Sequence, residues 1–75
     1  MNLKEYVGKM VRLIDIDGDI FTGHADIYHY DYDTASGIAA LTFLSDDGRY
    51  LDFDENEIAH IEIISDSVPV MAKVV

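Results

Sequence analysis

The sequence contains no cysteine and no tryptophan, a single proline, and only five basic residues among its 75. Without cysteine, disulfides and thiolate metal sites are excluded, and the composition fits a reducing cytoplasm, which is the compartment we expect. The longest apolar runs cover only a few residues, far short of the about 20 that a membrane span requires. Residues 1–9 carry an acid and lack an apolar stretch, so we expect neither a secretion signal nor membrane association.

The length of the chain limits the protein to one domain with a modest core. A chain of 75 residues buries only about 60% of the surface that its unfolded state exposes. Domains of this size often depend on disulfides, metals or oligomerisation for their stability. Since 49% of the residues are hydrophobic, we expect a folded globular protein and not a disordered one.

Acidic residues outnumber basic ones by fifteen to five, which gives a net charge of -10 at pH 7. This charge either keeps the surface soluble, or meets a basic partner, or competes with nucleic acid for a basic groove. Direct binding of nucleic acid is not expected, because phosphate recognition uses clustered lysine and arginine. The basic residues are instead scattered along the chain: Lys4, Lys9, Arg12, Arg49 and Lys73.

Short apolar segments with a period of two, separated by polar turns, predict five strands and therefore an all-β fold. Asp17 with Gly18, and residues 46–49, have the composition of hairpin turns. Five such strands with turns every 8–12 residues are typical of a small barrel. The predicted strands cover residues 10–16, 20–28, 38–44, 50–53 and 58–64.

Within these segments, the pattern also predicts where the chain bends and which side chains face inward. The inward face switches after Leu13, which indicates a bulge or a strongly coiled strand. The second strand should place Phe21, Gly23, Ala25 and Ile27 on one face, with a sharp bend at its two small residues. In the fifth strand, Ile61 and Ile63 are predicted to face inward.

Both ends of the chain carry additional elements. At the N-terminus, Asn2 is a favourable cap for a short helix that Gly8 would end. Residues 67–75 form an unusually apolar tail, which either packs back as an edge strand or joins a neighbouring chain. Its single proline, Pro69, would restrict it to an edge. The apolar side chains are Val68, Val70, Met71, Val74 and Val75.

The order of these elements resembles that of the Sm-like (LSM) proteins, over roughly residues 2–64. The similarity to the family's first motif lies in GKMVRL at residues 8–13 and DGDIFTG at residues 17–23, and similarity to the second lies in FDENEIAHI at residues 53–61. The resemblance implies a five-stranded SH3-like/Sm-like barrel with a short N-terminal helix, formed by residues 1–66. It also implies self-association through the last two strands.

The same resemblance implies RNA binding, but the residues that carry it in the family are absent here. The family has an asparagine in the loop before the third strand and Arg-Gly or Lys-Gly before the fifth. This chain has TASG at residues 34–37 and DENE at residues 54–57. Because carboxylates stand where a cation would contact phosphate, we do not expect RNA binding.

The most distinctive segment combines three tyrosines with two aspartates: Tyr28, Tyr30, Asp31, Tyr32 and Asp33. Interleaved aromatic residues stack on bases or methylated cations, or anchor protein interfaces. The alternative is an exposed, twisted end of a strand without a function. Because of the two carboxylates, the functional interpretation favours a protein partner with positive charge. We therefore predict these five residues as the partner-binding site.

No other cluster predicts a metal, a cofactor or a catalytic site. Asp15, Asp17 and Asp19 resemble the start of a calcium loop, but the chain then enters an apolar strand and lacks the remaining ligands. Zinc would require three or four converging ligands, and two of the three histidines share a strand face with a single carboxylate. The three histidines are His24, His29 and His60.

The sequence thus predicts a non-catalytic binding module that acts through protein–protein contact or self-association, as a homo-oligomer. No serine, cysteine or lysine stands in a nucleophile context, and we expect no small-molecule substrate. Two alternatives stay open: an RNA-binding LSM protein, which the charge opposes, and an acidic inhibitor of a nucleic-acid-binding protein, of the kind that phages encode.

Overall fold

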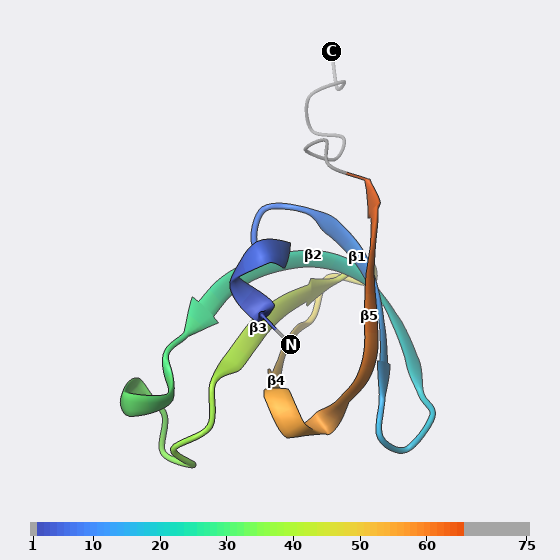
Figure 1. Cartoon of the computed structure of the whole chain (residues 1–75). Helices are drawn as coiled ribbons and strands as arrows, with labels where there is room; N and C mark the ends of the chain where they lie inside the picture. The colour runs from blue at the N-terminus through green and yellow to red at the C-terminus, as the bar shows by residue number, and fades with distance from the viewer. Residues whose placement is uncertain (1, 66–75) are drawn as a thin grey trace.

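The computed structural model describes residues 2–65, which form one strongly curved, five-stranded antiparallel sheet (Figure 1). The all-β class and the five strands predicted from the sequence are confirmed. The tail predicted over residues 67–75 lies outside the described residues. The strands are β1 (Met10–Asp15), β2 (Ile20–His29), β3 (Ala40–Ser45), β4 (Tyr50–Asp54) and β5 (Ile58–Ser65).

The predicted N-terminal helix is only a 3-10 turn, η1 (Leu3–Tyr6). The side chain of Asn2 caps it by accepting from the Lys4 amide. Gly8 ends it with a φ of 88°, and its amide donates to the Ala25 carbonyl oxygen at 2.8 Å, which draws the chain onto β2. No α-helix occurs in residues 2–65. The other two helical turns are also 3-10, η2 (Asp31–Asp33) and η3 (Glu55–Glu57).

The strands are ordered β4-β3-β2-β1-β5, so that β4 and β5 form the two edges of the sheet. Within residues 2–65 no ladder joins these two edges, and the sheet is not closed into a barrel. η3 carries the chain from one edge to the other across the open side of the curve (Figure 1). The Ile16 amide donates to the Glu57 carbonyl oxygen at 3.0 Å, which fixes η3 to the end of β1.

The hydrophobic core fills the inside of this curve. Leu3 of η1 is only 1% exposed and closes the core from the N-terminal side. The ring of Phe53 lies 5.2 Å from that of Phe21 and 6.1 Å from that of Phe43, centroid to centroid. The buried cluster contains Leu3, Val11, Leu13, Ala25, Leu41, Phe43, Phe53, Ile58 and Ile61.

A bulge in β2 corrects the predicted inward face of that strand. Ala25 pairs with Phe43 of β3, whereas Ile27 pairs with Thr42, so Asp26 is the extra residue. An extra residue reverses the alternation of side chains beyond it. Ile27 is consequently 48% exposed and does not face inward as predicted, while Tyr28 packs against the core.

Two further irregularities affect the ladder between β1 and β5, one between Met10 and Val11 and one between Ile14 and Asp15. Ile14 pairs with His60 and Asp15 with Ile58, so Ala59 is the extra residue at the second. The sequence predicted a bulge or a strongly coiled strand in the first strand, but β1 pairs with β2 without a register shift and the extra residue belongs to β5. Ile63 pairs with the buried Val11 and shares its inward face, as predicted, but it is 43% exposed.

Candidate functional site

Three tyrosine side chains stack in series where β2 runs into η2. We call Tyr28, Tyr30 and Tyr32 the tyrosine ladder. The rings of Tyr28 and Tyr30 meet edge to face, with centroids 5.0 Å apart and an interplanar angle of 86°. The rings of Tyr30 and Tyr32 are stacked, with centroids 5.2 Å apart and an angle of 13°. Burial of the ladder decreases outward, since Tyr28 packs on the core, Tyr30 is 40% exposed and Tyr32 is 76% exposed.

The local backbone explains this arrangement. The bulge at Asp26 turns Tyr28 toward the core, and the chain then leaves β2 in an extended conformation at Tyr30, with φ -69° and ψ 152°. One 3-10 turn follows, in which the Asp33 amide donates to the Tyr30 carbonyl oxygen at 2.9 Å. This tight turn brings Tyr32 back beside Tyr30, so residues that are two apart in the chain become stacked.

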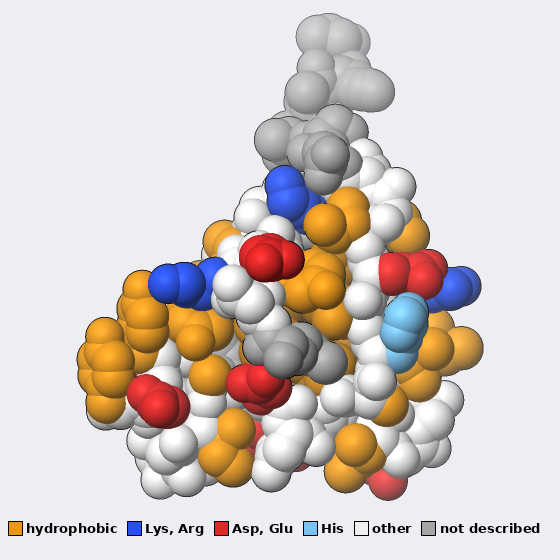
Figure 2. Space-filling model, viewed as in Figure 1, with side chains coloured by type: hydrophobic (Ala, Val, Ile, Leu, Met, Phe, Trp, Pro, Cys, Tyr) orange, Lys and Arg blue, Asp and Glu red, His pale blue; other side chains and the backbone are white. Residues whose placement is uncertain are grey.

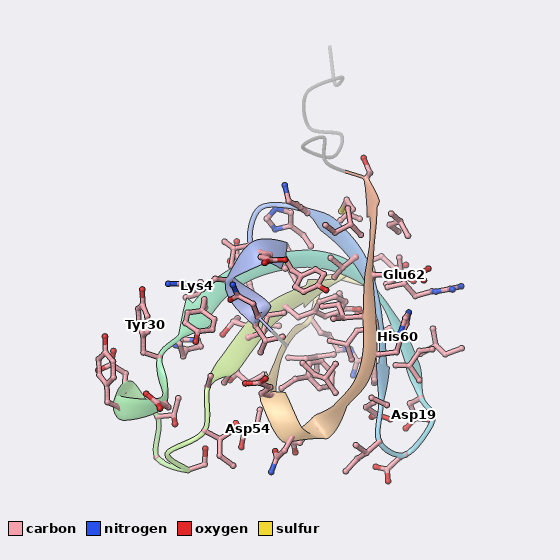
Figure 3. All side chains as sticks on the ribbon, in the orientation of Figure 1. Lys4, Asp19, Tyr30, Asp54, His60 and Glu62 are labelled. Atoms are coloured by element: carbon pink, nitrogen blue, oxygen red, sulfur yellow. The ribbon has the colours of Figure 1, made fainter. Side chains whose placement is uncertain are left out.

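A lysine from the N-terminal turn lies against the ladder. Lys4 of η1 places its Nζ 5.0 Å from the ring centroid of Tyr30 and 5.9 Å from that of Tyr28. The same Nζ donates to the Tyr30 hydroxyl at 3.4 Å. Figure 3 shows Lys4 and Tyr30 side by side, and Figure 2 shows the neighbouring group of hydrophobic side chains on that side of the molecule. Aromatic faces attract cations, and here the ladder already holds one.

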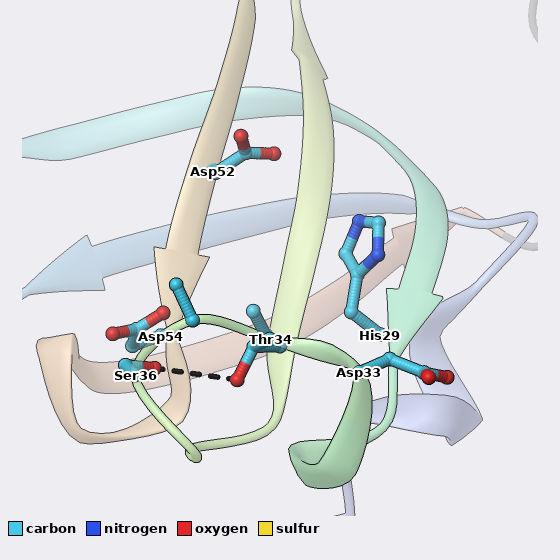
Figure 4. A pocket seen from close by; sticks show the side chains of 8 residues that line it. His29, Asp33, Thr34, Ser36, Asp52 and Asp54 are labelled. Carbon is cyan, nitrogen blue, oxygen red and sulfur yellow. Dashed lines mark hydrogen bonds between the residues drawn. The ribbon is translucent and has the colours of Figure 1, made fainter.

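Carboxylates neighbour the exposed end of the ladder in the chain. Asp31 and Asp33 flank Tyr32 in the chain, and both are exposed. Asp33 also lines a shallow hollow of about 390 Å³ beside the ladder (Figure 4). The described residues of its wall include three carboxylates and no lysine or arginine. The wall is formed by His29, Asp33, Thr34, Ala35, Ser36, Ala40, Asp52 and Asp54.

A hydrogen-bonded chain of three side chains runs beside this hollow. The Thr42 hydroxyl donates to Asp52 Oδ1 at 2.6 Å and lies 2.7 Å from His29 Nε2. Because the single hydroxyl proton points to the carboxylate, Thr42 must accept from His29, whose Nε2 therefore carries a hydrogen. The network holds the imidazole in one orientation and the Asp52 carboxylate at the wall of the hollow.

The hydroxyl groups in the hollow serve the loop that leads to β3. Thr34 Oγ1 donates to the Ile38 carbonyl oxygen at 2.9 Å and accepts from the Gly37 amide at 3.0 Å. Ser36 Oγ accepts from the Ile38 amide at 3.2 Å. These bonds fix the loop and leave the carboxylates as the groups that give the hollow its electrostatic character.

The remaining sequence candidates lie elsewhere. Asp15 Oδ1 accepts from the amides of Asp17 and Asp19, at 3.0 and 2.9 Å, which is an ordinary turn in the first hairpin. Two histidines lie near the carboxylate with which they share a strand. His24 Nδ1 is 3.6 Å from Asp26 Oδ1 in β2, and His60 Nε2 is 3.2 Å from Glu62 Oε1 in β5. Within residues 2–65, no group of three or more His, Cys, Asp or Glu side chains is arranged to hold a metal ion.

The structure thus brings all five predicted partner-binding residues into one region, and adds others that the sequence analysis did not select. Lys4 is 26 positions from Tyr30, and no local pattern signals their contact. The pairing of Thr42 with Asp52 is predictable from the sequence, because it follows from the register of the hairpin around residues 46–49.

Comparison with protein-family models, curated proteins and solved structures finds no match for this chain. No helix in the described part of the chain is both long and apolar enough to cross a membrane. The tyrosine ladder and the acidic hollow are therefore the features of the chain that bear on its function.

Proposed function

We propose that this protein is a non-catalytic binding module, which recognises a positively charged segment of a partner protein. The observation that carries the proposal is the tyrosine ladder, stacked outward from the core and ending in a Tyr32 ring that is 76% exposed. Stacked aromatic side chains supply a large contact area at low entropic cost, because they are ordered before the partner arrives.

Electrostatics support a cationic partner. The ladder already holds the Lys4 ammonium at 5.0 Å from the Tyr30 centroid, and the adjacent hollow is lined by three carboxylates. The chain as a whole carries a net charge of -10. A field of this sign steers basic partners toward the molecule and repels phosphate backbones.

The proposal also includes the finer fold assignment, a small barrel of the Sm-like or SH3-like type. It is supported by the strand order β4-β3-β2-β1-β5, by the N-terminal turn that covers the core, and by the 3-10 turn η3 between the last two strands. Self-association is a further expectation from the sequence. A solution mass well above 8.4 kDa in light scattering would support it, and a mass of one chain would contradict it.

Selection from a random peptide library tests the binding function without assuming which protein the partner is. The purified protein is the bait, and selected peptides are then measured against Tyr30→Leu and Tyr32→Leu variants. We expect lysine and arginine to be enriched at physiological salt, and the selected peptides to bind both variants more weakly.

The matched control is Tyr50→Leu, which removes a tyrosine of comparable exposure, 63%, on β4. This variant should bind the selected peptides as the unmodified protein does. If the ladder variants and the control retain the same affinity, the ladder is not the binding surface and the proposal fails.

A further inference from the structure

The tyrosine ladder has one end that is open to a partner. Tyr30 stacks on Tyr32 at an interplanar angle of 13°, which covers one face of the Tyr32 ring. Tyr32 is nevertheless 76% exposed, so its opposite face is free. A flat group placed on that face would continue the stack by one layer, parallel to the two rings beneath it.

The other end of the ladder indicates which charge such a group carries. The Lys4 Nζ lies 5.0 Å from the Tyr30 centroid and 5.9 Å from that of Tyr28, so both inner rings already face a cation. The described contacts of the Lys4 ammonium with the ladder are with the rings of Tyr28 and Tyr30 and with the Tyr30 hydroxyl. The open face of Tyr32 is therefore available to a positively charged group from another molecule.

The carboxylates beside Tyr32 supply acceptors for a group with several donors. Asp31 and Asp33 flank Tyr32 in the chain and are both exposed, and Asp33 also belongs to the wall of the hollow. A guanidinium group is planar, stacks on aromatic rings and donates up to five hydrogen bonds in its plane. An ammonium group is compact and cannot use a flat ring and a lateral carboxylate in the same way.

The geometry points to the open face of Tyr32 as a recognition site for an arginine side chain in a basic segment of a partner protein. The guanidinium stacks on the Tyr32 ring, and its edge donates to the carboxylate of Asp31 or Asp33. This assignment rests on the proposed binding function and sharpens it, because it distinguishes arginine from positive charge in general.

Titration with three matched peptides tests the assignment. Each is a capped glycine-serine peptide that carries a pair of arginines, a pair of lysines, or a pair of citrullines, the last being neutral and nearly isosteric with arginine. Backbone-amide NMR spectra of the full chain at physiological salt report both the affinity and the residues that respond. We expect the arginine peptide to bind most tightly and to shift the amides of residues 28–34.

Two sets of variants separate stacking from charge. Tyr32→Leu should lower the affinity for the arginine peptide by roughly 2- to 5-fold, as expected for loss of an exposed cation–π contact. Its effect on the affinity for the lysine peptide should be smaller. Changing Asp31 and Asp33 together to Asn should weaken both charged peptides. The charge-matched control is the same double change at Asp17 and Asp19 in the first hairpin turn, where Asp19 lies on the opposite side of the molecule from Tyr30 (Figure 3). It should have a smaller effect.

Each outcome bears on a different claim. Equal affinities for the arginine and lysine peptides, with responses still confined to residues 28–34, would overturn the arginine assignment and leave the binding module standing. Responses spread over the whole surface, unaffected by Tyr32→Leu, would refute both. If oligo-uridine shifted the same amides and competed with the arginine peptide, the occupant would be a nucleotide base and the assignment would be wrong.

Discussion

Among the five glycines, Gly23 is the one at which an added Cβ would meet neighbouring atoms. It lies in β2 opposite Ser45 of β3, and its φ is not in the left-handed region. A Cβ at this position would collide with the Leu44 carbonyl oxygen and approach the Ser45 Cα to 2.9 Å. Both neighbours are backbone atoms of the adjacent strand, so neither can move away by changing a rotamer.

The size of the effect follows from two opposing terms. Overpacking of this kind costs about 1–3 kcal/mol, and more when backbone must shift. Replacing glycine in a strand regains roughly 0.5–1 kcal/mol of conformational entropy. We therefore expect Gly23→Ala to lower the free energy of unfolding by about 2 kcal/mol, out of roughly 4–11 kcal/mol for a domain of this length. In a small domain, this corresponds to a fall in Tm of about 8–16 °C.

The matched control is Gly18→Ala in the first hairpin turn. Gly18 has a φ of 88° and open space around the position of a Cβ. Its substitution introduces backbone strain of about 1 kcal/mol without a collision. Urea titrations of both variants should show a lower midpoint at an unchanged slope, with the larger loss at Gly23. If Gly23→Ala is no less stable than Gly18→Ala, the close approach of β2 and β3 does not constrain this position.

Three further predictions concern charge and partners. The Ser45 hydroxyl donates to Asp47 and, together with Arg49, lowers the pKa of the Asp47 carboxyl below 3.8. The stabilisation that the ionised carboxylate gives the fold should therefore be present above pH 3.8 and be lost as the pH falls through the lowered pKa. The Tm difference between Asp47→Asn and an Asp46→Asn control should accordingly disappear at low pH, and a difference independent of pH would refute the cause. In a double-mutant cycle, Lys4→Met and Tyr30→Leu should show a coupling of about 0.5–1 kcal/mol, whereas additive effects would mean that the contact contributes nothing. Oligo-uridine should not bind at physiological salt, and micromolar binding in fluorescence anisotropy that weakens steeply with salt would contradict this.

The sequence was informative wherever structure depends on neighbouring residues. The period of two located all five strands, and Gly18 and Gly48 adopt the positive φ of 88° and 91° that hairpin turns of this composition require. The small residues Gly23 and Ala25 predict a sharp bend in the second strand, and the backbone of β3 lies close to Gly23. These features are set by local sterics and by alternation, which a single sequence displays directly.

The features that the sequence did not predict depend on how strands are paired across the sheet. The extra residues at Asp26 and Ala59 are defined by the register of the neighbouring strand, and no side chain at either position marks a bulge. The exposure of Ile63 likewise depends on what covers the edge of the sheet. The contact between Lys4 and Tyr30 joins two turns that are distant in sequence, and it exists only after η1 has packed its Leu3 into the core.

The bulge at Asp26 is also what makes the candidate site possible. If β2 alternated without interruption, Tyr28 would share the outer face with His24 and point away from the core. With the extra residue, Tyr28 pairs with Leu41 on the inner face and is held by the core. Tyr30 then meets a fixed ring edge on, and Tyr32 stacks on Tyr30.

Each ring therefore holds the next one in place, from the partly buried Tyr28 to the exposed Tyr32. A ring anchored in this way loses little conformational freedom when a partner binds, and preorganisation of this kind raises affinity without adding contacts. Tyr50, by contrast, is 63% exposed on β4 and stacks on no other aromatic ring within residues 2–65. This difference between Tyr32 and Tyr50 is the physical reason to assign recognition to the ladder and not to exposed aromatic surface in general.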